Sequence, residues 1–158
     1  MAGKQQRLYL MKKYSALYKR AMWFDMDKCV YCGAGRQCLD HVPAISLLEN
    51  IDVKRYLKQG GTLTLYPCCS KCNSLLGNTE ALSLYDRLQA LLKKYNKRLD
   101  RIEVWEDSEL KEMGKNMRSY IQSQQFKLKE LNDAVYNIDI KILQIETGKM
   151  DDDGMLLE

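Results

Sequence analysis

The amino-acid sequence predicts an α+β fold, in which a small unit of two strands and one helix is closed by a four-cysteine zinc site and flanked by helical segments. Two Cys-x-x-Cys pairs, forty residues apart, enclose the expected strands. On either side of them, apolar residues recur at steps of three and four, the spacing of amphipathic helices. Apolar residues make up 46% of the 158 residues, which is enough for a core and excludes general disorder.

The first segment, residues 1–24, is expected to be a basic amphipathic helix that runs from Gln5 to about Phe24. It carries six basic residues and no acidic one, namely Lys4, Arg7, Lys12, Lys13, Lys19 and Arg20. Such a local positive field favours a polyanion, although solvated helix faces look the same. We predict that this helix, together with Lys71, contacts nucleic-acid phosphates, with binding that falls steeply as salt rises.

The two strands belong to residues 25–78, the predicted metal-stapled core. Residues 37–41 suit a short strand that Pro43 limits, because proline donates no backbone hydrogen bond. Residues 62–66 alternate β-branched with apolar side chains, which predicts a second strand that Pro67 closes. The core is therefore expected to contain a pair of strands between its two cysteine pairs.

Helical patterns fill the rest of this core. Residues 44–59 are partly helical in pattern and end at Gly60-Gly61. From Ser70 onward the pattern is again helical, and Gly77 with Asn78 is a typical helix stop. The second cysteine pair is thus predicted to lie at the start of a helix.

Residues 79–147 are predicted to be helical. Thr79 is expected to cap a helix that runs to about Leu99, and a second, long helix is expected over 108–146. Its apolar positions keep a heptad frame: Leu110, Met117, Ile121, Leu128, Leu131, Val135, Ile138, Ile142 and Ile145. Packing on its own domain, an antiparallel hairpin and a homodimer seam all fit this frame. At ~1.5 Å per residue the helix would be about 60 Å long, which favours a dimer.

Residues 148–158 are expected to be an acidic, disordered tail.

The cysteine pairs are the strongest single signal. A two-residue gap lets both thiolates of a tight turn bind one tetrahedral ion, so Cys29, Cys32, Cys69 and Cys72 are predicted to form a closed Zn²⁺ site. Four protein ligands leave no open position, which makes this zinc structural. A redox pair would need only one motif and a βαβ context. Cys38 and Cys68 remain and are expected to be buried thiols.

Three polar residues lie in positions that suggest chemistry. His41 is the only histidine, it directly follows Asp40, and both lie at the predicted end of the first strand. Asn73 comes immediately after the last cysteine of the second pair, where a zinc-bound turn would hold its amide rigidly. Neighbours on a regular strand point to opposite sides, so Asp40 and His41 can share one site only if the strand bends there.

These motifs resemble the HNH, or ββα-metal, nuclease family. The resemblance rests on Cys29-Val-Tyr-Cys32-Gly33, Leu39-Asp40-His41-Val-Pro43 and Cys69-Ser-Lys-Cys72-Asn73, and it covers about residues 24–78. It implies a zinc-stapled ββα-metal finger between an N-terminal helix and a long helical C-terminal half. It also implies a metal-dependent endonuclease that hydrolyses phosphodiester bonds in DNA and leaves 5′-phosphate and 3′-hydroxyl ends.

By the same resemblance, His41 is the general base, and its neutral imidazole, with an unperturbed pKa of about 6.5, suits that role. Asp40 and Asn73 are implied as oxygen ligands of one catalytic Mg²⁺ or Mn²⁺ ion. The family often has an asparagine nine residues before its final asparagine, which helps to orient the histidine. Thr64 stands at that position, and its hydroxyl is the candidate substitute.

The layout of the chain is also similar to that of the phage endonuclease VII family, which resolves Holliday junctions and other branched DNA. Such a resolvase is one alternative. A non-catalytic zinc module that binds nucleic acid is another, and a subunit of a larger assembly is a third. No signal peptide or membrane span is expected, so we predict an intracellular, cytoplasmic protein of prokaryotic or phage type whose partners are DNA and a second copy of itself.

Overall fold

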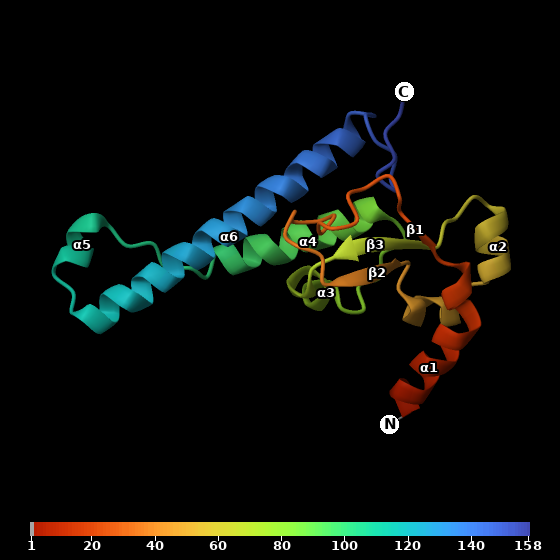
Figure 1. The fold of residues 1–158 in the computed structure, drawn as a ribbon, viewed down its shortest axis with the longest axis horizontal. Coiled ribbons are helices and arrows are strands. Elements are labelled where there is room, and N and C mark those ends of the chain that lie inside the picture. Colours follow the sequence, from red (N-terminus) through yellow and green to blue (C-terminus); the bar gives the residue numbers. More distant parts are fainter. Residues whose placement is uncertain (1) are drawn as a thin grey trace.

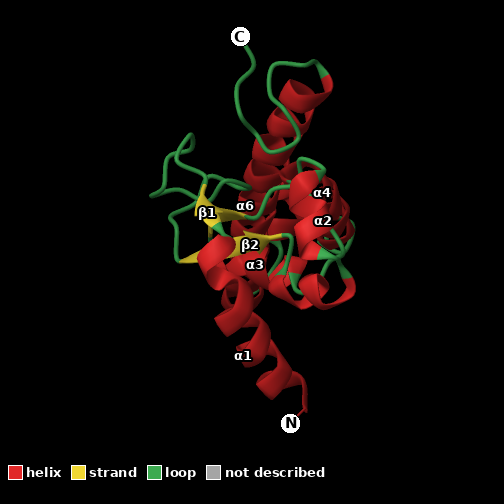
Figure 2. Cartoon of the chain, turned by 90° about the vertical axis from the view of Figure 1, so that its right-hand side faces the viewer, coloured by secondary structure: helices red, strands yellow, loops and turns green. Residues whose placement is uncertain are grey.

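The structure is a computed structural model that describes residues 2–158 (Figure 1). Helices outweigh strands, and a small sheet lies at the centre of the molecule (Figure 2). In chain order the elements are α1 (Ala2–Tyr14), the 3-10 helix η1 (Ser15–Leu17), β1 (Lys19–Arg20), β2 (Cys38–Val42), the 3-10 helix η2 (Ile45–Asn50), α2 (Val53–Lys58), β3 (Thr64–Cys68), α3 (Ser70–Leu76), α4 (Leu84–Leu99), α5 (Asp107–Lys111) and α6 (Lys115–Glu146). The predicted α+β class is confirmed.

The sheet has the order β1-β3-β2. Strands β2 and β3 are antiparallel, and their register pairs Asp40 with Tyr66 and His41 with Leu65. Strand β1 runs parallel to β3 and pairs only with Thr64 and Leu65. Beyond Leu65, β3 therefore pairs only with β2 and its other edge has no partner strand. Pro67 is tolerated in β3 because its missing N–H would have faced this unpaired edge. This is why β3 extends beyond the residue that we expected to close it.

The ββα unit is β2, β3 and α3. Cys69 caps α3, since its sulfur accepts a hydrogen bond from the backbone N–H of Cys72. Gly77 ends the helix with φ at +50°, a conformation that glycine adopts without strain. Strand β2 and helix α3 each start within one residue of the position predicted from the sequence.

The C-terminal half is an antiparallel pair of helices, α4 and α6, that lies beside the ββα unit (Figure 1). Leu84, Leu88 and Leu91 of α4 are fully buried, as is Ile138 of α6. These residues belong to one apolar core with the buried cysteines of the ββα unit. The helical half and the ββα unit therefore share a core.

Two helix boundaries differ from the sequence prediction. Ser83, not Thr79, caps α4, because its hydroxyl accepts from the backbone N–H of Asp86 at 3.2 Å. The long helix predicted over 108–146 is broken into α5 and α6, and Gly114, which falls inside that span, is the N-cap of α6. Glycine is a poor helix interior residue, which explains the break.

The predicted N-terminal helix is also shorter than expected. Helix α1 ends at Tyr14, and the chain then turns to place β1 on the edge of β3. Tyr18 and Ala21 are buried there, although both lie within the span that was predicted to be one helix. Helix α1 packs on η2 and projects away from the sheet (Figure 2).

The acidic segment 148–158 was expected to be disordered and instead folds back on the core. Met150 is buried and pairs with Leu156 in a short bridge. The hydroxyl of Tyr66 donates a hydrogen bond to the Asp153 carbonyl at 2.8 Å. A Cβ on Gly154 would stand 2.5 Å from the Phe24 ring, so this turn closes directly on the N-terminal segment.

Most heptad residues of α6 pack within the chain, whereas Met117 is exposed. Ile121, Leu131, Ile138, Ile142 and Ile145 are all buried. Of the alternatives, the intrachain antiparallel packing is therefore present, and a homodimer stays a prediction that light scattering can test.

No helix within residues 2–158 combines the length and apolar character needed to cross a bilayer.

Packing on α6 can be tested at two isoleucines that lie two residues apart on different sides of the helix. Ile138 is fully buried and Ile140 is 37% exposed. Ile138→Ala should lower the free energy of unfolding by about 2–5 kcal/mol, because it removes buried methyl groups and leaves a cavity. Ile140→Ala should cost much less. Urea unfolding followed by circular dichroism measures both, and equal losses would contradict the packing described here.

Candidate functional site

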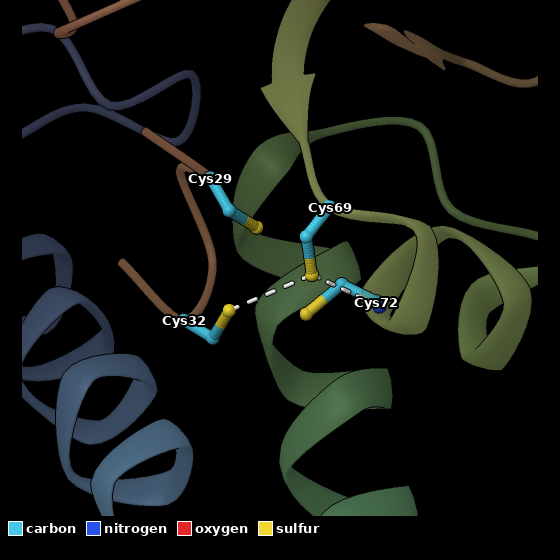
Figure 3. A group of neighbouring side chains, drawn as sticks. All are labelled: Cys29, Cys32, Cys69 and Cys72. Atoms are coloured by element: carbon cyan, nitrogen blue, oxygen red, sulfur yellow. Dashed lines mark hydrogen bonds between the residues drawn. The ribbon is translucent and has the colours of Figure 1, made fainter. Parts of the chain in front are cut away.

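Four cysteine sulfurs converge beside the sheet (Figure 3). Cys29 and Cys32 come from the loop between β1 and β2, whereas Cys69 and Cys72 come from the start of α3. All four sulfurs lie within 4.8 Å of one another, and those of Cys32 and Cys69 are 3.7 Å apart. Tetrahedral zinc with bonds of about 2.3 Å requires sulfurs about 3.8 Å apart. The predicted cluster is therefore assembled and can hold a metal ion such as zinc.

The backbone fixes both halves of this cluster. Gly33 donates from its N–H to the Cys29 carbonyl at 2.9 Å, and its φ of +79° is the left-handed conformation that this tight turn requires. Asn73 donates in the same way to the Cys69 carbonyl at 3.0 Å. Each pair is thus presented by a hydrogen-bonded turn that holds its two sulfurs close together.

Helices α4 and α6 add groups around the cluster that the sequence pattern did not reveal. The Tyr95 hydroxyl lies 3.1 Å from the Cys72 sulfur, close enough to donate to a thiolate. The Asn137 amide donates to the Cys32 carbonyl at 3.0 Å. Lys141 is half-buried nearby; burial lowers its pKa, and the neighbouring sulfurs of Cys29, Cys32 and Cys72 oppose that shift. Its positive charge can offset the excess negative charge of four thiolates on a divalent ion.

The two remaining cysteines lie outside the cluster. Cys68 is fully buried and its thiol bonds to the Cys69 carbonyl at 3.2 Å. Cys38 is half-buried and bonds to the Cys68 carbonyl at 3.4 Å. Both have the backbone partners expected of thiols that bind no metal.

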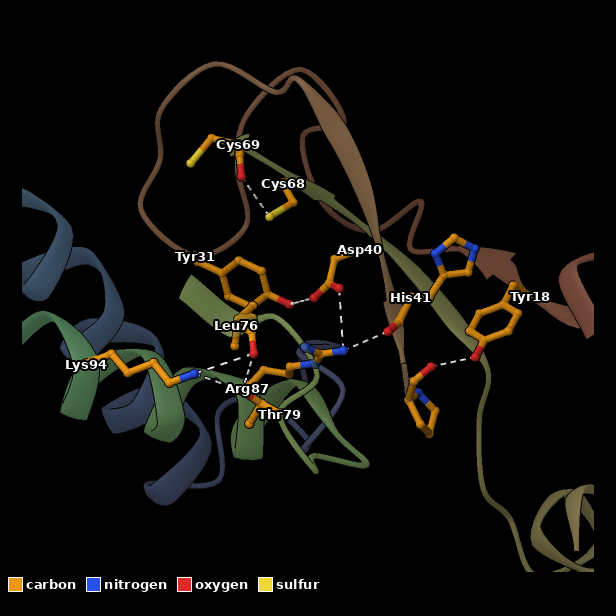
Figure 4. A network of polar contacts seen from close by, with 11 residues as sticks. Tyr18, Tyr31, Asp40, His41, Cys68, Cys69, Leu76, Thr79, Arg87 and Lys94 are labelled. Carbon is orange, nitrogen blue, oxygen red and sulfur yellow. Dashed lines mark hydrogen bonds and ion pairs between the residues drawn. The ribbon is translucent and has the colours of Figure 1, made fainter. Parts of the chain in front are cut away.

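Asp40 is buried, and both of its carboxylate oxygens have polar partners (Figure 4). One carboxylate oxygen accepts from the Tyr31 hydroxyl at 2.5 Å, and the other lies 3.5 Å from Nη2 of Arg87. Burial raises the pKa of Asp40, while the Arg87 charge and the Tyr31 hydrogen bond oppose that rise. The carboxylate is therefore part of an internal polar network.

His41 points to the other side of the strand, toward Tyr18 (Figure 4). Its ring meets the Tyr18 ring edge-on, with centroids 4.8 Å apart and an angle of 76°. Burial lowers the pKa of His41, and the positive charges of Arg7 and Arg87 lower it further. The imidazole is thus neutral at pH 7. The local bend that would bring Asp40 and His41 to one side is not present, and the strand keeps its alternation.

Thr64 and Asn73 are also separated from the histidine. Thr64 pairs with Val42, and partners across the ladder share a face, so Thr64 lies on the Asp40 side of the sheet. It is buried there, away from the imidazole that we expected it to orient. Asn73 is exposed on α3 one residue after Cys72. The structure therefore brings the four cysteines together but does not bring Asp40, His41, Asn73 and Thr64 to one site.

This arrangement does not fit a hard cation at Asp40. The oxygens that would bind Mg²⁺ or Mn²⁺ are occupied by a tyrosine hydroxyl and a guanidinium, and the Asp40 side chain is nearly inaccessible to solvent. Arg87, which lies beside Asp40, is the residue of this network that the sequence analysis did not identify. The available signal was its position: Arg87 stands three residues after Leu84 and four before Leu91, inside an apolar helix stripe.

No protein-family profile matches the chain, and comparisons with curated proteins and with solved structures found no match.

The contact of α4 with the cysteine cluster gives a testable prediction. Tyr95→Phe removes the hydroxyl beside the Cys72 sulfur, and zinc affinity should fall about tenfold or more, since partners of metal ligands typically contribute that much. Competition with a chromophoric chelator measures the affinity. Tyr85→Phe on the same helix is the matched control, because its hydroxyl bonds to Glu146 instead. An unchanged affinity in Tyr95→Phe would contradict the role of this hydrogen bond.

Proposed function

We propose that the protein is a DNA endonuclease of the HNH type, built on a structural zinc site. One observation carries the proposal: β2 and β3 form an antiparallel pair that α3 follows, with the cysteine cluster closing the unit and the Asp-His pair on β2. The order and placement of these parts agree with the motif resemblance. The zinc would be structural because its four ligands are all cysteines.

His41 is the residue best suited to act on a water molecule. Among the residues that the structure describes, none donates a hydrogen bond to its imidazole, so a ring nitrogen is free to accept a proton. The lowered pKa keeps it in the neutral form at pH 7. A water beside this nitrogen would lose its proton to His41 and attack the phosphorus. The bond from phosphorus to the 3′ oxygen would break, leaving 5′-phosphate and 3′-hydroxyl ends.

Positive charge on the His41 side of the sheet supports a nucleic-acid substrate. Arg7 of α1 lies close enough to lower the His41 pKa. Arg20 on β1 is exposed and pairs with Leu65, which also pairs with His41, so it shares that face. The lysines of α1 are exposed as well. Lys71 was also expected to contact phosphate, but its ammonium group forms an ion pair with Glu130 of α6 at 3.3 Å. It is therefore a weaker candidate for a phosphate contact.

The resemblance adds Mg²⁺ or Mn²⁺ held by Asp40 and Asn73, and a cation there would supply charge neutralisation at the phosphate. Asp40 is bound to Arg87 and is not free for that role as placed. The same observation favours a second candidate function, a zinc module that binds nucleic acid without cutting it. Branched DNA and a homodimer are included in the proposal because of the resolvase-like layout.

A cleavage assay separates these two functions. Zinc-loaded protein is mixed with supercoiled, linear and four-way-junction DNA and with Mg²⁺ or Mn²⁺. His41→Ala should reduce the rate about 10²–10⁴-fold, the usual contribution of a general base. Asn73→Ala tests the second implied residue, and Asn78→Ala, also exposed and beyond the end of α3, is the control. Full cleavage by folded His41→Ala would overturn the mechanism, and no cleavage by the wild type favours the binding module.

The pH dependence of cleavage has a defined direction. Burial lowers the His41 pKa below its ordinary 6.5, and only the neutral imidazole can take a proton. The rate should therefore stay on its plateau to a lower pH than an unshifted imidazole would allow, and fall tenfold per pH unit below the lowered pKa. Because His41 is the only histidine, its imidazole proton resonance gives that pKa directly. A rate that already falls at pH 7 or above would contradict this assignment.

A further inference from the structure

The backbone carbonyl of His41 is held by a side chain from α4. Leu65, which stands opposite His41 in the sheet, directs its own carbonyl to the N–H of Ala21 on the β1 side at 3.0 Å. Opposite residues of an antiparallel ladder turn their backbone groups either both toward each other or both away. The His41 carbonyl therefore faces the outer edge of β2, and Nη2 of Arg87 donates to it there at 2.8 Å.

Tyr18 holds the same end of β2 from the other face of the sheet. Its hydroxyl donates a hydrogen bond to the Pro43 carbonyl, and its ring meets the His41 ring edge-on (Figure 4). Two bonds from side chains to the backbone thus fix the end of this edge strand, one at His41 and one two residues later. A shift of the strand at His41 changes the contact between the two rings.

Arg87 is itself held by groups that lead back to the cysteine cluster. Its Nη2 atom lies 3.5 Å from one Asp40 oxygen, and the other oxygen accepts from the Tyr31 hydroxyl at 2.5 Å. Tyr31 is fully buried and belongs to the first Cys-x-x-Cys turn. A continuous series of polar contacts therefore runs from that turn through Asp40 and Arg87 to the backbone of His41 (Figure 4).

Stability alone does not account for an arginine at this position. Arg87 is 1% exposed, and its Nε and Nη1 atoms are buried with no hydrogen-bond partner in the described part of the chain. Burial of a charge is costly when its donors are only partly satisfied, and apolar residues often replace such buried ion pairs without loss of stability. The well-formed bond of this side chain is the one to the His41 carbonyl, which an apolar residue could not make.

We propose that Arg87 is the positioning residue for His41, and that the Asp40 carboxylate, braced by Tyr31, holds this guanidinium instead of a metal ion. The proposal rests on the proposed function in one respect, that His41 is the base. A misplacement of about 1 Å can cost about 10²-fold in rate, so the support of this strand end matters to catalysis. Asp40 then acts on the reaction through Arg87 and the β2 backbone, without contact to the phosphate.

The position of His41 can be measured without any nucleic acid. In the zinc-loaded full chain at about pH 8, where an imidazole is neutral, the nuclear Overhauser cross-peak between the His41 and Tyr18 rings reports their separation. Asp40→Asn combined with Arg87→Met removes both charges together, so that no unpaired charge stays in the core. The cross-peak should be largely lost in this double variant. Arg87→Lys, which can still donate to the carbonyl, should retain more of it.

Two control variants on α4 separate positioning from stability. Leu91→Ala truncates a fully buried side chain and should lower the free energy of unfolding while it leaves the cross-peak intact. Arg98→Met removes an exposed arginine and should change neither quantity. An unchanged cross-peak in the folded double variant overturns the proposal, and so does an equal loss of the cross-peak in Leu91→Ala.

Cleavage kinetics test the role of Asp40 itself. Asp40→Asn should lower kcat by up to about 10²-fold, whereas the Mn²⁺ concentration that gives half-maximal rate should stay as in the wild type. Loss of a metal ligand would raise that concentration, and such a rise overturns the assignment of Asp40. If the wild type cleaves no DNA, the proposed function fails, and the cross-peak still decides whether Arg87 positions His41.

Discussion

The convergence of four cysteine sulfurs is the contact on which the other parts of this fold depend. It joins a loop that precedes the sheet to the helix that follows it, and the surrounding core contains residues from α4 and α6. Tyr95 and Asn137 carry the connection further, since each bonds directly to a cysteine of the cluster. In small zinc modules, metal binding contributes roughly 10–16 kcal/mol and is inseparable from folding. Here it would order the helical half as well as the finger.

The second constraint is the alternation of side chains along β2. Because Asp40 and His41 are neighbours, the strand directs one toward α4 and the other toward Tyr18. Asp40 consequently enters a buried polar network with Tyr31 and Arg87, and His41 stays half-buried on the side that carries the basic N-terminal segment. The division gives the two residues different electrostatic surroundings, with a raised pKa for the acid and a lowered pKa for the histidine.

Local patterns in the sequence predicted those parts that depend on local physics. The cysteine spacing identified the metal ligands, and proline and glycine located the end of β2 and the end of α3. Features that depend on tertiary packing could not be predicted from local sequence patterns. The end of α1 is set by the pairing of β1 with β3, and the fold of residues 148–158 is set by contacts with Tyr66 and Phe24. Arg87 could have been noticed as a charge in an apolar stripe, but its partner lies 47 positions earlier in the chain and no local pattern connects them.

Helix α6 extends well beyond the helix that covers it (Figure 1). Asn137 ties it to the Cys32 loop, and 22 residues separate that point from its first residue, Lys115. At a rise of ~1.5 Å per residue this distance is about 33 Å. An uninterrupted helix transmits rotation at one end to the other. A tilt of α6 about the Asn137 contact would therefore displace α5, which connects the far end of α6 to α4, more than it displaces the residues beside the cysteine cluster.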